Sequence, residues 1–366
     1  MTAALNAVGR WFERGDFTPR DVAIFRIVFS LIMLAGFPQF HWAADYPQTF
    51  FRPPWGPFAL LGGFPPVQVL FALEALLAVA LVSLLVGYFT RTASVIVSIV
   101  AIVGLGYSYS LGKVDHTMYL WVAPLFLLFA GWGDALSIDA LRRGQRRSVP
   151  ATTPQWPLRL YAVVTASAML TAALPKISNG WLAPGSSATY ASLVGEYFGN
   201  ERTAWLAGFF VGLDVPFLWE ALDWLTVIAE AALVVLVFTW RSRRIGLAIL
   251  CLFHVGVLLT LTIAFWQNVV AYGAFLLWSR VPWPTLRPAT RRWPIAIAPV
   301  VVIVGGLGAW WAVTVFGPAT PWLGPVLVLT GGAVGIGYLA TLAVRLLGWF
   351  TRSRGSARLT AADQRD

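Results

Sequence analysis

Charged residues are scarce in this chain, and so are the residues that build most soluble active sites. Of 366 residues only 11% are charged and 58% are hydrophobic, whereas charged residues make up about 25% of soluble domains. Lysine occurs twice and histidine three times, and the single cysteine, Cys251, excludes disulfides and cysteine-rich zinc clusters. No glycine-rich phosphate loop, metal-ligand cluster or Ser/His/Asp pattern stands out. The composition therefore points away from the common classes of soluble enzyme.

Long apolar runs are present instead, and they recur along most of the chain. Runs of about 20 residues match the ~30 Å hydrocarbon core of a bilayer, and tryptophans lie beside many of their ends, as in an interfacial aromatic belt. We expect an all-α fold, a polytopic transmembrane helical bundle. About ten spans are predicted, at 21–40, 67–87, 92–110, 117–133, 156–177, 216–240, 245–264, 266–280, 294–316 and 325–350. The eighth is short enough to be re-entrant.

The arginines predict how these spans are oriented. Clusters such as "RRGQRR" (142–147) and "RSRR" (241–244) fall on one side of the membrane if the spans number ten. Because positive residues accumulate on the cytoplasmic side, we expect both termini in the cytoplasm and the protein in the plasma membrane. The same rule explains the net charge of +10 without a nucleic-acid partner.

Two long segments, 41–66 and 178–215, are predicted on the opposite, outer side. They are rich in proline, glycine and aromatic residues, so we expect interfacial or re-entrant helices that cap a cavity, because irregular backbone at membrane depth must be buried in protein. Beyond the eighth span, 281–350 is predicted to add two transmembrane helices, and 351–366 a disordered cytoplasmic tail.

Arginine is the usual cation here, which draws attention to the two lysines. A buried lysine can lose its proton and act as a base, which arginine cannot. Lys176 ends the fifth span in "LPKISNGW", where it either snorkels to the outer interface or holds its amine in a partly dry outer cavity. Lys113, Asp115 and His116 precede the fourth span. Asp115 either caps that helix or orients the imidazole of His116 inward.

Charged residues inside spans are costly and are therefore candidates for function. Glu230 lies near the middle of the sixth span. His254 in the seventh is its expected partner, either for helix packing or for catalysis. Arg26 in the first span can snorkel back to the cytoplasmic side, whereas Glu74 lies inside the second. Asn268, at the start of the eighth span, is a candidate for lining the outer cavity.

Several segments carry a family resemblance when they are taken in order. They are "DVAIFRIVFSLIML", "DHTMYLWVAPLFLLFA", "GDALSID", "LPKISNGWLAPG" and "LFHVGVLL". The set resembles the horizontally transferred transmembrane (HTTM) family, which is named for the membrane part of vitamin K-dependent gamma-glutamyl carboxylase and its bacterial relatives. The resemblance covers residues 18–280, which we take as the HTTM-like domain.

The resemblance implies a quinone or vitamin K-like lipid as cofactor. By it, Lys176 is the base that deprotonates the hydroquinone, and His116, with Asp115 beside it, is its neighbour. Trp181, in the same segment as Lys176, and Asn268 are the candidates for cofactor contact. Carboxylases continue into a large lumenal domain, whereas this chain continues into two further predicted spans, so glutamate carboxylation itself is not transferred.

Three functions remain open from the sequence. The first is an outward-facing cavity that binds a quinone or another lipid-like ligand, with or without catalysis. The second is a non-enzymatic partner in the maturation of an exported peptide, acting through 41–66 and 178–215. The third is a proton-coupled transporter that uses Glu230 and His254.

Overall fold

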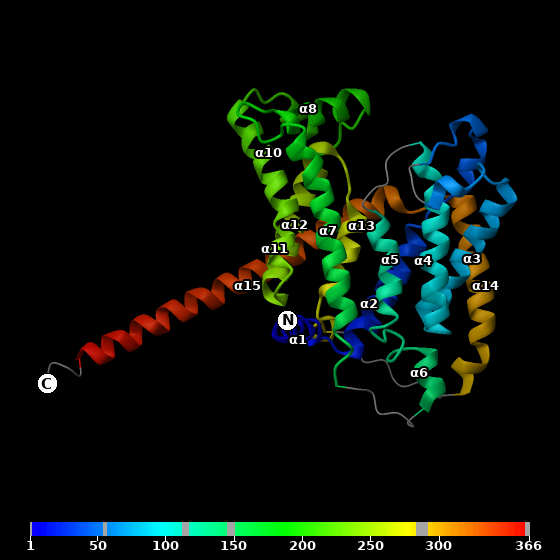
Figure 1. The fold of residues 1–366 in the computed structure, drawn as a ribbon, viewed down its shortest axis with the longest axis horizontal. Coiled ribbons are helices and arrows are strands. Elements are labelled where there is room, and N and C mark those ends of the chain that lie inside the picture. The colour runs from blue at the N-terminus through cyan, green and yellow to red at the C-terminus, as the bar shows by residue number, and fades with distance from the viewer. Residues whose placement is uncertain (1, 54–56, 112–116, 145–150, 283–291, 363–366) are drawn as a thin grey trace. The chain divides into compact units, whose positions relative to one another are not determined.

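The chain is helical throughout the part that the computed structural model describes, which comprises residues 2–53, 57–111, 117–144, 151–282 and 292–362 (Figure 1). Within these ranges helices alternate with turns and bends, and there is no β-strand. The predicted all-α class is thus confirmed for the described residues. The chain divides into two compact units, Met1–Met169 with Gln267–Gly324 and Leu170–Trp266 with Pro325–Asp366.

Within the described residues, six helices are long and apolar enough to cross a membrane. They are α3 (Val67–Val86), α4 (Thr90–Gly106, extended by η4, Tyr107–Ser110), α7 (Trp156–Ser178), α12 (Trp240–Leu261), α14 (Arg292–Phe316) and α15 (Thr320–Ala362). Their limits lie close to six of the predicted spans. The total of ten spans and the cytoplasmic position of both termini stay predictions.

The other four predicted spans form shorter helices. These are α2 (Pro19–Ala35), α5 (Thr117–Leu127), α10 (Pro216–Ala231) followed by α11 (Leu233–Leu236), and α13 (Trp266–Tyr272). The start of α2 and the end of α13 show how two of these helices are bounded. A capping box between Thr18 and Asp21 starts α2, and 3₁₀ turns η7 (Gly273–Phe275) and η8 (Trp278–Arg280) replace the helix after α13.

Short elements fill the remaining described segments. The N-terminal helix is α1 (Thr2–Glu13), and 41–66 contains the 3₁₀ turns η1 (His41–Asp45), η2 (Gln48–Phe50) and η3 (Pro57–Leu60). A short helix, α6 (Ile138–Arg143), follows α5. Helix α15 extends to Ala362, and the disordered tail assigned to 351–366 stays a prediction.

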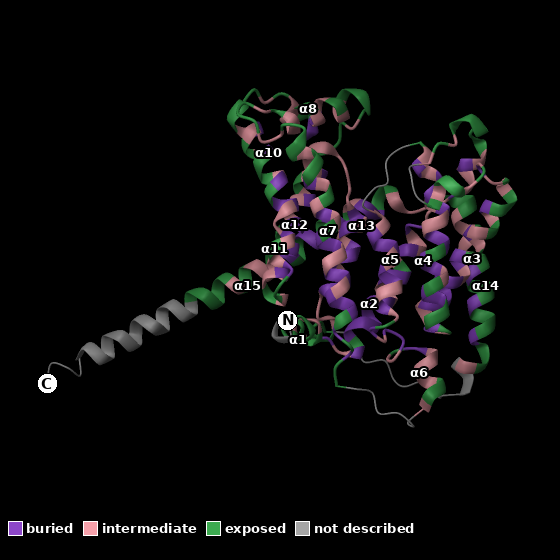
Figure 2. Cartoon of the chain, viewed as in Figure 1, coloured by how far each residue is buried: buried purple, intermediate pink, exposed green. Residues whose placement is uncertain are grey.

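The first unit is built around α3. This helix packs against α2, α4 and α14, and α4 also packs against α5 (Figure 1). Much of α2 is buried (Figure 2), including Phe25, Phe29 and Met33. A helix that is apolar on most of its surface is stable only when other helices or lipid cover it. The neighbours of α2 therefore explain why it is buried although it is shorter than a membrane span.

Arg26 joins the ends of two segments in this unit. Its guanidinium donates hydrogen bonds to the carbonyl oxygens of Leu84 at 2.7 Å and Leu136 at 2.5 Å. The residue is completely buried, so it does not snorkel to the surface as the sequence suggested. The carbonyls at a helix end lack partners within the helix, and Arg26 supplies one for the last turn of α3.

Gly87, which ends α3, is expected to be intolerant of a side chain. Its φ of +71° lies in the left-handed region, and an added Cβ would overlap the Arg26 guanidinium and the Ser137 side chain. We expect Gly87→Ala to lower the free energy of unfolding by more than about 2 kcal/mol, since strain and overlap add. Gly256→Ala is the control, because nothing lies within 4 Å of its added Cβ. Reversible unfolding in detergent micelles measures both, and equal losses would contradict the prediction.

The second unit contains the long segment 178–215. It forms α8 (Ala188–Val194), a π-helical turn η6 (Gly195–Gly199) and α9 (Ala207–Val211). Leu193, Ala207 and Trp219 form a small buried cluster here. Asp223 of α10 is fully buried and accepts the N–H groups of Ala188 and Thr189 at 3.0 and 2.7 Å. A side-chain carboxylate thus caps α8 from a neighbouring helix and fastens the segment to α10.

Candidate functional site

The clearest pair of opposite charges inside predicted spans is Lys176 with Glu230. The Lys176 Nζ atom lies 2.7 Å from Oε1 and 2.6 Å from Oε2 of Glu230, and 3.2 Å from the carbonyl oxygen of Ala172. An ammonium group has three N–H donors, so these three acceptors match it in number. Side-chain exposure is 22% for the lysine and 11% for the glutamate, which leaves the amine partly accessible.

The end of α7 fixes where Lys176 lies. The N–H of Trp181 bonds to the carbonyl of Lys176 at 3.1 Å, and the N–H of Gly180 bonds to that of Ile177 at 3.2 Å. Gly180 has φ +80°. These are the two bonds and the left-handed residue of a Schellman motif, which commonly ends a helix. Lys176 is therefore held in the last turn of α7.

The same motif brings Trp181 to the amine. The Nζ atom of Lys176 lies 5.5 Å from the centre of the Trp181 ring, within the range of a cation–π contact. In a Schellman motif the residue after the glycine often packs against this position of the helix. Lys176 and Trp181 were separate candidates in the sequence, and they are in contact in the structure.

Glu230 reaches Lys176 from the end of α10. Helix α10 ends one residue later, at Ala231, and α11 continues from Leu233 to Leu236, within the predicted span 216–240. Glu230 is paired with Lys176, and its predicted contact with His254 stays a prediction. His254 lies in α12 of the same unit, 2% exposed, with its ring against Phe253 and Phe265.

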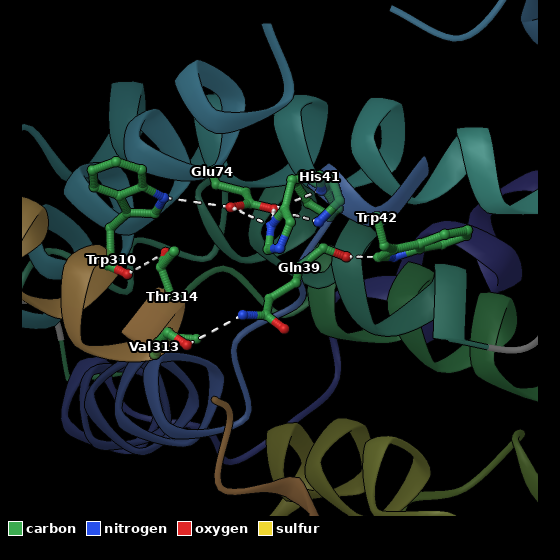
Figure 3. Close-up of polar contacts among 8 residues, drawn as sticks. Gln39, His41, Trp42, Glu74, Trp310, Val313 and Thr314 are labelled. Atoms are coloured by element: carbon green, nitrogen blue, oxygen red, sulfur yellow. Dashed lines mark hydrogen bonds and ion pairs between the residues drawn. The ribbon is translucent and has the colours of Figure 1, made fainter. Parts of the chain in front are cut away.

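Glu74 belongs to a different cluster, in the first unit (Figure 3). This residue of α3 is fully buried, and its carboxylate accepts hydrogen bonds from residues of the segment after α2 and from α14. One of these partners, His41, was not among the predicted site residues. The sequence signal was slight, because His41 stands alone in an aromatic loop and Glu74 is 33 positions away.

The remaining predicted site residues are less defined. Asp115 and His116 lie outside the described residues, as does Lys113, so their proximity to Lys176 stays a prediction. Asn268 is 3% exposed in α13 of the first unit, and its place beside a ligand is likewise untested.

A cavity is found in the first unit, away from these residues. It has a volume of about 460 Å³ and lies between the start of α4 and α6, lined by Thr90, Asp139 and Arg143 among others. Asp139 accepts from the N–H groups of Phe89 and Thr90, and Arg143 pairs with Asp134 at 2.9 Å. These acidic groups cap and fasten helices, and none of the predicted site residues lines the cavity.

Comparison with known proteins places the chain in a family. No curated protein and no solved structure matches it. The family described as HTTM domain matches residues 16–283, which is most of the chain and contains Lys176, Glu230 and Glu74. The resemblance inferred from the ordered segments is confirmed, and the chain belongs to the HTTM domain family.

Proposed function

We propose that this HTTM-family membrane protein binds a quinone-like or other aromatic lipid beside Lys176, and that the Lys176–Glu230 pair exchanges a proton with the ligand. The main support is the contact between the amine and both carboxylate oxygens at 2.6–2.7 Å. Intramembrane ion pairs are rare and commonly mark the sites of function in membrane proteins.

The pair can hold its proton on either partner. With the proton on Lys176 it is an ammonium–carboxylate pair, and with the proton on Glu230 it is an amine and a carboxylic acid. Only the second form leaves the lysine able to act as a base. In the second form the Lys176 amine has a lone pair that can accept a hydroxyl proton, so Glu230 stores the proton that Lys176 must lose before it acts as a base.

The surroundings of Lys176 fit an aromatic ligand with oxygen substituents. The amine can donate to a carbonyl or accept from a hydroxyl, and the Trp181 ring offers an aromatic face beside it. Leu174 and Ile177 on the same helix end are 51% and 44% exposed, which suits a lipid-like molecule. A quinol would supply a phenolic proton when bound. Among the contacts of Lys176, the one to the Ala172 carbonyl is the longest and involves no charge on the acceptor, so a ligand oxygen would displace it first.

A second candidate function rests on the exposed aromatic residues of 178–217. Phe198, Phe209 and Phe217 are 69%, 63% and 81% exposed. Such residues either lie in the lipid interface or contact another chain, and the latter would suit a partner in the maturation of an exported peptide. In the predicted topology this surface and Lys176 both face the outside of the plasma membrane.

Mass spectrometry of small molecules that co-purify in mild detergent tests the lipid-binding proposal. We expect wild-type protein to retain an aromatic lipid and Lys176→Ala to retain at least about tenfold less, a loss equivalent to ~1.4 kcal/mol of binding. Lys176→Arg keeps a cation but cannot serve as a base. We expect this variant to retain the lipid but to lose proton exchange with it in a proton-transfer assay, which separates binding from chemistry.

Arg202→Ala is the matched control. Arg202 pairs with Glu196 at 2.9 Å in the same unit, but its side chain is 40% exposed. We expect this variant to retain the ligand. If wild-type protein carries no aromatic lipid, or if Lys176→Ala and Arg202→Ala retain it equally, lipid binding at Lys176 is wrong. Loss of peptide maturation after changes at Phe209 and Phe217, with Lys176→Ala tolerated, would instead support the second candidate.

A further inference from the structure

The first unit holds a second candidate site, around His41 and Glu74 (Figure 3). Glu74 is buried in α3, and its carboxylate contacts nitrogen atoms of the backbone, of the His41 ring and of the Trp310 ring. Oε1 accepts from the backbone N–H groups of Phe40 and His41, the latter at 2.9 Å, and contacts His41 Nδ1 at 2.9 Å. Oε2 lies 3.2 Å from the same Nδ1 and accepts from Trp310 Nε1 at 3.4 Å. The carboxylate therefore acts as an acceptor on all sides.

These contacts define which nitrogen of His41 carries the proton. Nδ1 faces both oxygens of Glu74, and with Glu74 as a carboxylate, which only accepts, Nδ1 is the donor. In a neutral imidazole the proton on Nδ1 leaves the lone pair on Nε2. A carboxylate that orients a histidine in this way is the arrangement by which many proteins prepare the far nitrogen to accept a proton. Among the described residues, no hydrogen bond to Nε2 of His41 is found.

Burial differs sharply between the two side chains. The Glu74 side chain is 1% exposed and that of His41 is 29% exposed. One face of the imidazole stacks on Phe71, with ring centres 4.9 Å apart and planes at 28°. Phe71 in turn lies edge-on to the Trp310 ring at 6.1 Å. The carboxylate is thus buried inside the protein, while the imidazole stacks on one aromatic ring and its side chain stays partly exposed.

The neighbouring part of the chain is aromatic as well. Trp42, Tyr46 and Phe50 contact one another in sequence, with ring centres 5.8 and 6.2 Å apart, and Tyr46 and Phe50 are 40% and 52% exposed. Tryptophan and tyrosine are typical of the interfacial layer of a membrane. The segment that carries His41 therefore offers exposed aromatic rings to an apolar molecule.

We propose that His41 and Glu74 form a binding site for an amphipathic alcohol or phenol, whose hydroxyl donates to Nε2 of His41. Glu74 is a positioning residue in this site, because it acts on the ligand only through the imidazole. The site lies in the first unit and does not depend on the function proposed for Lys176. A purely structural role, in which Glu74 only fastens the segment after α2 to α3 and α14, would need neither the accessibility of the imidazole nor a free lone pair.

Nitrogen NMR of protein labelled at the histidine rings tests the proposal with two matched probes, para-octylphenol and para-octylanisole. The two differ only in that the anisole has a methyl group in place of the hydroxyl hydrogen. The chain has three histidines, and His41→Gln assigns the His41 signals. We expect Nδ1 of His41 to be protonated and Nε2 not. The phenol should shift the Nε2 signal in a saturable way, whereas the anisole should leave it unchanged.

Variants separate positioning from structure. Thr314→Val removes only a hydrogen bond of 2.9 Å to the backbone carbonyl of Trp310 and should retain the response to the phenol. Glu74→Gln should give a mixture of His41 tautomers and a weaker response. A protonated Nε2 in wild-type protein would overturn the proposal, and so would an Nε2 signal that neither probe shifts or that both shift equally. These outcomes concern unmodified protein, so they remain decisive even if Glu74→Gln does not fold.

Discussion

Replacing Lys176 with alanine is expected to lower the free energy of unfolding by about 2–3 kcal/mol. The change leaves the carboxylate of Glu230, whose side chain is 11% exposed, without the ammonium that contacts both of its oxygens. Removing one partner of a fully buried ion pair costs about 3–5 kcal/mol, and the 22% exposure of the lysine side chain lowers that value. Reversible unfolding in detergent micelles, followed by tryptophan fluorescence, measures the loss.

A double variant tests whether the loss comes from the pair. Lys176→Met with Glu230→Leu replaces both charges with apolar side chains, and we expect it to recover most of the stability lost in Lys176→Ala. Apolar replacement of a whole buried pair is often neutral or stabilising. Glu230→Leu alone is measured as well. If its loss in the free energy of unfolding simply adds to that of Lys176→Ala in the double variant, the two residues are not coupled and the effect comes from packing.

Glu74→Leu is expected to have the larger effect, at least about 3 kcal/mol. The leucine removes the acceptor for two backbone N–H groups, the His41 ring and the Trp310 ring together. Each buried donor left without a partner costs about 1–3 kcal/mol. The same unfolding measurement applies, and we expect the segment after α2 to become sensitive to proteases because its contact with α3 is lost.

Trp310→Phe is the matched control for this prediction. It keeps an aromatic ring against Phe71 and removes only the longest of the contacts to Glu74, at 3.4 Å. We expect it to cost less than about 1 kcal/mol, the typical net value of one hydrogen bond. Comparable losses in the two variants would show that packing of α14, and not the acceptor role of Glu74, holds this region together.

Hydropathy was sufficient to locate the six candidate spans but not to place every helix end. The limits of α3, α7 and α14 follow from apolar runs that start or stop at proline, glycine or charge. The run after Glu230 contains only apolar residues as far as Phe238, so nothing in it predicts the single residue, Ala232, that separates α10 from α11.

The candidate residues were largely predictable one by one, whereas their partners were not. Lys176 and Glu230 stood out because charges inside apolar runs are rare. Their pairing joins positions 54 residues apart, and a nearby span offered His254 as a plausible alternative. The prediction that Arg26 reaches the cytoplasmic surface used only its distance from one end of its own helix. Its acceptors are carbonyls of Leu84 and Leu136, which belong to other segments, and side-chain patterns reveal nothing about such carbonyls.

The Schellman end of α7 makes the distance along the chain between Lys176 and Trp181 a fixed quantity. The spacing Lys-x-x-x-Gly-Trp must be kept, because the N–H of Trp181 bonds to the carbonyl of Lys176 in this cap. One residue inserted between lysine and glycine would rotate the amine by about 100° around the helix axis and away from the ring. Three residues must therefore separate the lysine from the glycine, whereas the identity of those three residues is less restricted. Sequences that share this register can be recognised as candidates for the same amine–indole arrangement even where the rest of the helix has diverged.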